Sequence, residues 1–308
     1  MKNVISERVV KEKFLKRMMD KLIEKELSKR AQVFNQKREL PFAIFSGDYI
    51  GQNVSIHGLY EKEYLADLFK LMVTIGIDLS SSTAIDIGAN IGNHTIEFSK
   101  YFKKVICFEP NPRTFDILFA NTKNIKNIEV FSLGCGMDNQ VLKLQENYKN
   151  IGSSTAKFKI ETDNSVEIEI KPLDEFLDKI SKLALIKIDV EGMETDVLKG
   201  AVKTIDKFNP IICFEQNEWE FTEEFVETEA VEWLRAKGYH IYANFFPVTP
   251  KKRNIILRRL HNIRQLLFGI VEKRKIVEYK KLPKAGYHMV YAIHSSLEIP
   301  SLNSNNLK

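Results

Sequence analysis

The sequence predicts an α/β protein built on a mostly parallel sheet with helices on both faces. From residue 83 onwards, short apolar runs alternate with stretches of helical periodicity, and the first run ends in a glycine-rich turn, DIGANIG (86–92). Alternating strands and helices form units that bury a parallel sheet between helical layers. The composition agrees, because 44% of the 308 residues are hydrophobic and 28% are charged. This balance excludes disordered, collagen-like and disulfide-scaffold chains.

Each element follows from its own pattern. Apolar runs predict strands at 83–88, 105–110, 128–132, 183–189, 210–216, 239–244 and 287–294. Apolar residues three or four positions apart predict helices at 4–30, 60–76, 93–101, 113–123, 174–181, 194–208 and 225–237. Polar and apolar residues alternate at 141–145 and 166–171, which predicts a hairpin. We divide the chain into a helical extension (1–56), a core domain (57–298) with a basic helical insertion between the last two strands (245–286), and a disordered tail (299–308).

Charge is unevenly spread along the chain. Residues 1–40 carry twelve Lys and Arg against six Asp and Glu, and residues 251–281 carry eleven against two. The net charge is +5, so the part between these segments is acidic. Basic segments on an acidic body indicate anionic partners. The N-terminal helix can pack on the body, which is our default, pair with another copy to form an oligomer, or lie on a surface.

The turn after the first strand and the acid that closes the second predict a nucleoside site. Ligands bind beyond the carboxyl ends of parallel strands. Gly88 and Gly92 allow a tight turn close to a ligand, and the helix from Asn93 directs free N–H groups at a carboxylate or phosphate. Asn at 90 and 93 replaces glycines of a dinucleotide fingerprint, which disfavours a diphosphate. Glu109 can accept both hydroxyls of one ribose. Together these features describe S-adenosylmethionine.

Several segments resemble one known family over roughly residues 57–217. IDIGANIGNHT, VICFEPNPRTFDILFAN, LIKIDVEGMETDVLKGA and PIICFEQN, together with GLYEKEYL (58–65) and PLDEF (172–176), are similar to the FkbM family of S-adenosylmethionine-dependent methyltransferases. The resemblance implies a class I methyltransferase (Rossmann-like) fold that acts mostly on hydroxyl groups of sugars or natural products. It also implies that the cofactor is held by Asp86, Gly88, Ala89, Asn90, Gly92, Glu109, Pro110 and Asn111.

Two further cofactor contacts stay open. Glu61 can pair with the methionine ammonium, or it can serve as an ordinary helix N-terminal carboxylate. Many class I enzymes carry an acid just after the third strand, where it contacts adenine. Here the first acid after that strand is Asp138, which follows the run LGCG. Asp138 is therefore our candidate for the adenine contact, and the adenine partner is not fixed by the sequence.

Methyl transfer to a hydroxyl needs an in-line nucleophile and a group that takes the proton. Lys187, Asp189 and Glu191 alternate at the end of the fourth core strand, so we expect them on one face near the methyl group, with Glu215 adjacent. We favour Asp189 or Glu191 as general base. Alternatively, Asp189, Glu215 and Asn217 bind Mg²⁺ through oxygen atoms. In a third interpretation, Lys187 pairs with the acids for structure alone.

The insertion between the last two strands should overhang the pocket. Its apolar residues follow helical spacing between Arg and Lys, which predicts a lid for an anionic or lipid-linked glycan, with peripheral membrane contact through 251–275. A packed helix with solvated charges is the alternative. The loop at 148–165 is a second candidate wall for the acceptor.

The sequence therefore predicts a cytoplasmic O-methyltransferase for a saccharide acceptor, peripheral to the inner face of the membrane. No apolar run approaches the ~18–20 residues that span a bilayer, no export signal is visible, and three widely spaced cysteines indicate buried thiols. An RNA 2′-O-type methyltransferase is a rival, although aromatic residues are not interleaved with Lys and Arg, which disfavours nucleic acid as a partner. Two more rivals are a nucleotide-dependent oxidoreductase and a non-catalytic membrane-associated binding protein.

Overall fold

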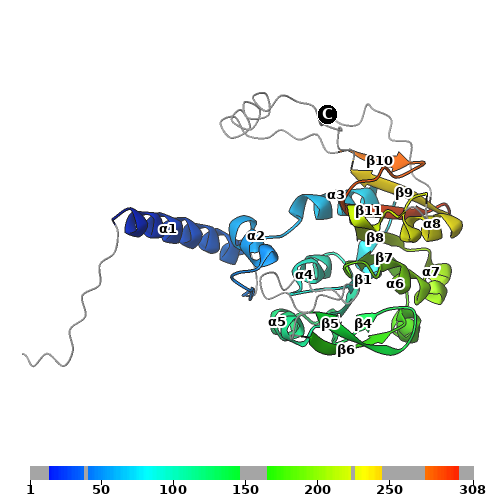
Figure 1. Cartoon of the computed structure of the whole chain (residues 1–308), viewed down its shortest axis with the longest axis horizontal. Coiled ribbons are helices and arrows are strands. Elements are labelled where there is room, and N and C mark those ends of the chain that lie inside the picture. Colours follow the sequence, from blue (N-terminus) through cyan, green and yellow to red (C-terminus); the bar gives the residue numbers. More distant parts are fainter. Residues whose placement is uncertain (1–13, 38–40, 146–164, 223–225, 245–274, 298–308) are drawn as a thin grey trace, which may run out of the picture.

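An eight-stranded sheet forms the centre of the protein (Figure 1). The computed structural model describes residues 14–37, 41–145, 165–222, 226–244 and 275–297. The strands of this sheet are β1 (Thr83–Ile87), β2 (Lys104–Phe108), β3 (Ile128–Phe131), β7 (Leu183–Ile188), β8 (Ile211–Gln216), β9 (Tyr239–Asn244), β10 (Ile276–Tyr279) and β11 (Tyr287–His294).

The strand order is β10-β9-β11-β8-β7-β1-β2-β3. The neighbouring strands β3, β2, β1, β7 and β8 pair in parallel. β11 is antiparallel to both β8 and β9, and β10 is antiparallel to β9. The order reverses between β1 and β7, which is where ligands bind in open α/β sheets. This topology confirms the class I methyltransferase fold that the sequence predicts.

Helices cover both faces of the sheet, as predicted. They are α3 (Lys62–Thr74), α4 (Asn93–Ser99), α5 (Pro112–Thr122), α6 (Glu194–Lys199), α7 (Val202–Phe208) and α8 (Glu229–Ala236), with short 3-10 turns η1 (Leu79–Ser81), η3 (Leu173–Lys179) and η4 (Glu218–Glu220). On one face, Ala84 of β1 belongs to the cluster that contains Leu68 of α3. On the other face, Ile85 belongs to the cluster that contains Leu198 of α6 and Leu234 of α8. Because both faces are buried, the central strands are mostly apolar, with Asp86 in β1 and Lys187 in β7 as buried charged exceptions.

A second, three-stranded sheet has the order β4-β6-β5. β5 (Gln140–Gln145) and β6 (Ser165–Lys171) form the predicted antiparallel hairpin. β4 (Gly134–Cys135) pairs in parallel with β6, and at two residues it is too short to leave a periodic signal in the sequence. Buried Leu144, Ile168 and Ile170 form the apolar face of this sheet. Most of the predicted loop at 148–165 lies outside the described residues.

The N-terminal helix differs from the expectation. Within the described residues it is α1 (Phe14–Lys37), and every side chain from 14 to 29 is exposed, so the expected packing of this helix on the body is wrong for that stretch. Contact begins near the end of α1, where Arg30 Nη1 donates to the carbonyl of Ile56 in α2 (Tyr49–His57) at 2.6 Å. The Phe34 ring lies against Gly58, the C-cap of α2. No helix in the described ranges is long and apolar enough to cross a bilayer.

Three predicted helices differ most from the expectation. The one expected at 174–181 is the 3-10 helix η3 (Leu173–Lys179). The helix expected at 194–208 is split into α6 and α7, because the Gly200 carbonyl accepts from Asp174 N at 3.1 Å and its Cα packs on the backbone at Gly136. The helix expected at 225–237 begins only at Glu229, after an extended N-cap at Thr228.

The insertion expected at 245–286 ends in a strand that the sequence analysis missed. Ile276 of β10 pairs opposite Asn244 of β9. The Arg235 guanidinium holds this end in place, because its Nε donates to the Glu227 carboxylate at 2.6 Å and its Nη2 to the carbonyl of Tyr279 at 2.7 Å. The helix, lid and membrane contact predicted for 251–275 and the tail at 299–308 fall almost wholly outside the described residues. The three cysteines are buried, as predicted.

We predict that Gly200→Ala destabilises the protein. An added Cβ would lie 1.8 Å from the carbonyl oxygen of Gly136, and neither backbone can yield without disturbing the α6–α7 turn. Overpacking of this kind lowers the free energy of unfolding by about 1–3 kcal/mol, measurable in urea. Gly47→Ala is the matched control, because nothing lies within 4 Å of its added Cβ. Equal stability of the two variants would contradict the steric explanation.

Candidate functional site

One pocket lies at the carboxyl ends of β1, β2, β7 and β8, where the strand order reverses. Its volume is about 220 Å³. Glu109 and the apolar face of the three-stranded sheet line one end, whereas Lys187, Asp189 and Glu215 line the other. The structure therefore brings most of the predicted nucleoside residues and the predicted catalytic residues into one cavity, whereas Glu61, Asp86, Gly92 and Asp138 are not among its lining residues.

The glycine turn is shaped by the protein around it. Gly88 and Gly92 have φ of +79° and +90°, which favours glycine. An added Cβ on Gly88 would lie 1.8 Å from the carbonyl oxygen of Asp189, and one on Gly92 would lie 2.9 Å from Leu118. Both glycines therefore make room for neighbouring protein, and their approach to a ligand stays a prediction. Gly88, Ala89 and Asn90 line the pocket, and Gly92 is not among the lining residues.

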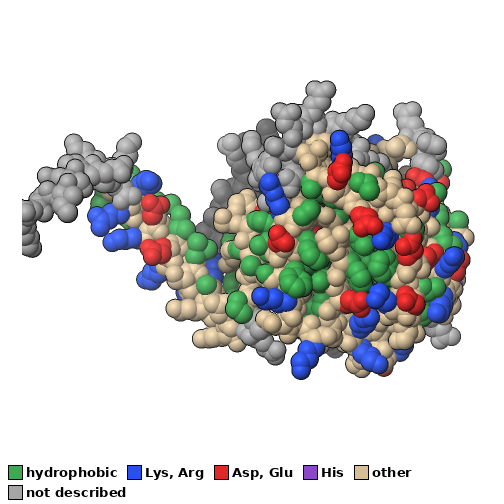
Figure 2. Space-filling model, turned by 90° about the horizontal axis from the view of Figure 1, so that it is seen from below, with side chains coloured by type: hydrophobic (Ala, Val, Ile, Leu, Met, Phe, Trp, Pro, Cys, Tyr) green, Lys and Arg blue, Asp and Glu red, His purple; other side chains and the backbone are tan. Residues whose placement is uncertain are grey.

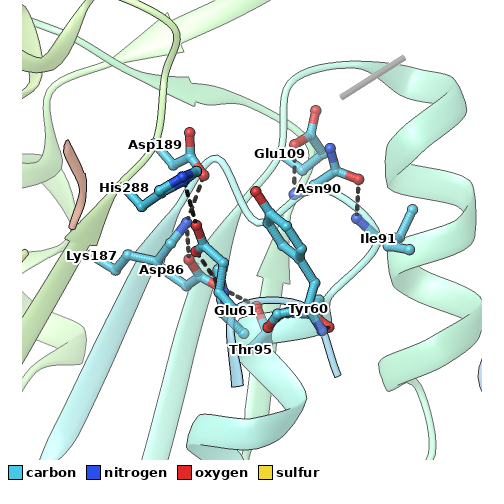
Figure 3. A network of polar contacts seen from close by, with 12 residues as sticks. Tyr60, Glu61, Asp86, Asn90, Ile91, Thr95, Glu109, Lys187, Asp189 and His288 are labelled. Carbon is cyan, nitrogen blue, oxygen red and sulfur yellow. Dashed lines mark hydrogen bonds and ion pairs between the residues drawn. The ribbon is translucent and has the colours of Figure 1, made fainter. Parts of the chain in front are cut away.

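Glu109 is a buried carboxylate whose two oxygens each accept one backbone N–H. Oε2 accepts from Asn90 N at 2.9 Å (Figure 3), and Oε1 accepts from Asn111 N at 2.9 Å. Burial, with smaller contributions from Asp189 and Asp86, raises the pKa of Glu109 to about 7. The two hydrogen bonds act in the opposite direction and lower the pKa, but burial outweighs them. The group stands directly after β2, with Pro110 and Asn111 beside it in the pocket lining. It can therefore accept further hydrogen bonds from a ligand.

A chain of buried polar groups joins β1 to β7. Thr95 Oγ1 donates to Asp86 Oδ2 at 2.6 Å, and Lys187 Nζ lies 3.6 Å from Asp86 Oδ1 and 3.1 Å from Asp189 Oδ2 (Figure 3). Burial opposes the charge on Lys187, but Asp189, Asp86 and Glu61 outweigh it and raise the pKa of the ammonium. Asp86 is fully buried and does not line the pocket, so it acts on the pocket through Lys187.

Glu61 lies beneath the pocket between two histidines. Its Oε2 is 3.3 Å from His94 Nε2, and its Oε1 is 3.5 Å from His288 Nδ1 of β11. Burial raises the pKa of Glu61, but the contacts with His288 and His94 and the charge of Lys187 outweigh it and lower the pKa to about 2. Glu61 is also the N-cap of α3, without a side-chain capping bond, so its charge lies at the helix N-terminus as the alternative prediction has it.

The sequence analysis missed Tyr60 and His288. The Tyr60 ring lies between Glu109 and the Asp189–Lys187 pair (Figure 3), and it lines the pocket. Its backbone is held by the side chain of Asn93, which accepts from Tyr60 N at 3.0 Å and donates to Tyr60 O at 3.1 Å. Tyr60 stands in the GLYEKEYL segment, which could have pointed to it. His288 left no signal, since it is a half-exposed residue in an alternating strand.

Three carboxylates meet at the second end of the pocket. The strand β7 ends at Ile188, so the prediction that Glu191 continues the strand on the same face as Lys187 is wrong. Glu191 lies in the following turn with φ of +51°, and it still lines the pocket. Burial together with Asp189 and Glu191 raises the pKa of Glu215 to about 8. Burial together with Asp189 and Glu220 raises the pKa of Glu191 to about 7.

Asp138 and Asn217 lie apart from the cavity. Asp138 is exposed in the turn between β4 and β5, and the pocket at that end is lined by Gly134, Cys135, Leu144, Ile168 and Ile170. Asn217 is the N-cap of η4, and its side chain forms a capping box with Glu220. Among the described residues, no group of three or more His, Cys, Asp and Glu is arranged to hold a metal ion.

Comparison with known proteins connects this site to one family. The family model of the Methyltransferase FkbM domain matches residues 86–241. The protein named Methyltransferase 1 of Beauveria bassiana is 30% identical over 145 residues, which cover 39% of this chain and 58% of the relative. The hexuronic acid methyltransferase AglP of Haloferax volcanii is 32% identical over 129 residues, which cover 41% of this chain and 53% of the relative.

The chain therefore spans a little more than half the length of these curated relatives. Among solved structures, the Methyltransferase FkbM of Methylobacillus flagellatus KT is similar at 23% identity with a TM-score of 0.32, over 44% of this chain and 33% of that one.

We predict that Lys187→Met costs about 3–5 kcal/mol of stability at neutral pH. The substitution leaves the buried Asp86 and the carboxylate of Asp189 without their shared cation. The deficit should shrink in acid, where a carboxylate that has lost its cation takes up a proton. Chemical denaturation across a pH series measures both effects. Lys182→Met, at an exposed lysine that bonds Ser81, is the control, and equal losses in the two variants would refute the assignment.

Proposed function

Because the chain belongs to the FkbM methyltransferase family, we propose that it transfers a methyl group from S-adenosylmethionine to a hydroxyl group of a saccharide. The observation that carries the proposal is the single cavity that joins Glu109 after β2 to Lys187, Asp189 and Glu215 at the ends of β7 and β8. The matched hexuronic acid methyltransferase supports a sugar acceptor.

The residues at the first end fit a nucleoside. Glu109 uses one lone pair of each oxygen on backbone N–H groups, which orients the carboxylate toward the cavity for two ribose hydroxyls. Leu144, Ile168 and Ile170 offer an apolar wall for adenine, and Asp138 is not among the lining residues. The turn at Gly88–Asn90 would hold the methionine end. Glu61 is not among the lining residues either, so its pairing with the methionine ammonium stays a prediction. When bound, the cofactor supplies an electrophilic methyl group.

The second end can take the proton that an acceptor hydroxyl must lose. Asp189 accepts from Lys187 Nζ at 3.1 Å, so its carboxylate is already engaged in an ion pair. Glu215 faces the same cavity with a pKa raised to about 8, and a base is most effective when its pKa is near the working pH. We therefore assign Glu215 as the general base, in place of Asp189 or Glu191, which the sequence pattern favours. Asp189 and Glu191 keep the pKa of Glu215 high.

The Mg²⁺ alternative has less support. It needs Asn217 as the third oxygen ligand beside Asp189 and Glu215. The Asn217 side chain instead accepts a backbone N–H within η4, and Asn217 is not among the residues that line the pocket. Proton transfer to a carboxylate requires only groups that already face the cavity.

The first test of this function is cofactor binding. We expect Glu109→Gln to weaken S-adenosylmethionine binding roughly tenfold to hundredfold in calorimetry, because a charged acceptor for the ribose is lost. Wild-type affinity should fall as the pH drops below about 7, since protonated Glu109 accepts less well, whereas the variant should show no such dependence. Glu129→Gln, a surface carboxylate paired with Lys104, is the control. Unchanged affinity in Glu109→Gln would remove the basis of the proposal.

The second test is the pH dependence of turnover with a panel of saccharide acceptors. The rate should rise with pH and level off above about 8, because Glu215 must be ionised to take the proton. Glu215→Gln should lower turnover roughly 10²- to 10⁴-fold and leave S-adenosylmethionine affinity within about twofold, since Glu215 is assigned to the acceptor and not to the ribose. Glu218→Gln, an exposed neighbour, should match the wild type. A Glu215→Gln variant with the wild-type rate and profile would exclude Glu215 as the base.

A further inference from the structure

The first ten residues of α1 expose a continuous apolar strip. Large side chains there are between 42% and 79% exposed: Phe14, Leu15, Met18, Met19, Leu22 and Ile23. At about 100° per residue, all six fall within one half of the helix circumference. Figure 1 shows that α1 extends away from the body, so the body does not cover this strip. Isolated exposed apolar residues need no explanation, but a strip of this length on a projecting helix does.

The charges of α1 are arranged around the strip. On the same helical wheel, Lys16 and Lys21 fall along its two edges, whereas Asp20 and Glu24 fall on the opposite side together with Arg17. The whole helix carries seven Lys and Arg against three Asp and Glu. Figure 2 shows these charged side chains beside the apolar ones on the projecting helix. Basic edges and a polar back are the pattern of a helix that lies in the interface of an anionic bilayer.

A second copy of the chain fits this strip less well. If two α1 helices paired through their apolar strips, the edges would meet, and both edges are lysine over these turns. Paired helices are stabilised by opposite charges at such edge positions and are destabilised by like charges. Anionic lipid headgroups complement both edges at once.

The other end of α1 connects the strip to the pocket. Arg30 bonds the carbonyl of Ile56, and Phe34 packs on Gly58, so α1 is fixed to α2. The first residues of α2, Tyr49 and Ile50, line the pocket. A surface bound by α1 would therefore lie on the side of the molecule from which α2 reaches the cavity.

We propose that α1 docks the protein on an anionic lipid bilayer, with residues 14–23 lying along the interface. The strip enters the boundary between headgroups and acyl chains, and the flanking lysines contact the headgroups. The segment between the two basic parts of the chain is acidic, which would keep the body from adhering to the same surface on its own. This proposal does not depend on methyl transfer, because vesicle binding can be measured with neither cofactor nor acceptor.

The test is co-sedimentation of the full chain with vesicles. Binding is expected to vesicles of phosphatidylcholine mixed with phosphatidylglycerol, to be much weaker with phosphatidylcholine alone, and to fall as salt is raised. Leu15→Ser with Leu22→Ser should lower the partition coefficient by at least roughly tenfold, because buried apolar surface is lost. Lys16→Gln with Lys21→Gln should lower it by roughly 20- to 30-fold, at about fivefold for each charge.

Matched controls distinguish this proposal from non-specific adsorption to vesicles. Asp20→Asn with Glu24→Gln, on the back of the helix, should retain binding, and so should Val141→Ser at an apolar residue that is exposed on β5. Light scattering of each variant reports the oligomeric state. Wild-type binding by the Leu15→Ser, Leu22→Ser variant would overturn the proposal. The proposal would also be overturned if the wild type were a dimer and the Leu15→Ser, Leu22→Ser variant a monomer. A third contrary result would be that binding is lost only when Lys251 and Lys252 are replaced.

Discussion

The structure of the site depends on one buried ammonium group. Lys187 stands at the end of β7 between Asp86, in the neighbouring strand β1, and Asp189, in the turn that follows. Lys187 supplies a positive charge to both carboxylates, of which Asp86 is fully buried. Asp86 in turn accepts from Thr95 at the start of α4, which ties the glycine turn to the same group. The cation thereby connects the glycine turn to Asp189, which lines the cavity.

Carboxylates in the two halves of the cavity differ through their surroundings. Glu61 has two histidines and Lys187 nearby and stays charged over the whole physiological range. Burial raises the pKa of Glu109 to about 7 although two backbone N–H groups oppose the shift, and burial with neighbouring acids raises the pKa of Glu215 to about 8, so both titrate near neutrality. Groups whose pKa values are driven apart in one site can carry out different tasks at the same pH. Here one acid can remain a fixed charge while another moves a proton.

Most of the fold follows from local patterns in the sequence. The central strands are recognisable because both faces are buried, so β1 and β7 are apolar apart from Thr83, Asp86 and Lys187. Of the elements that were missed, α2 is only nine residues long, β4 has two residues and β10 follows a basic stretch, and the break at Gly200 comes from its approach to Gly136. In the site, residues that follow a strand, such as Glu109 and Asp189, were found because parallel strands end together. Tyr60 and His288 reach the same region from elements distant in sequence, and no periodicity marks them.

The pairing of β9 with β10 has a consequence for how this protein can change over evolutionary time. Asn244 and Ile276 stand opposite one another, so the chain leaves the sheet and rejoins it at neighbouring positions. The Arg235–Glu227 pair fixes the returning strand independently of what comes between. Insertions, deletions or wholesale replacement of the intervening segment therefore leave the strand register intact. Related chains can diversify there while the sheet and its cavity are inherited unchanged.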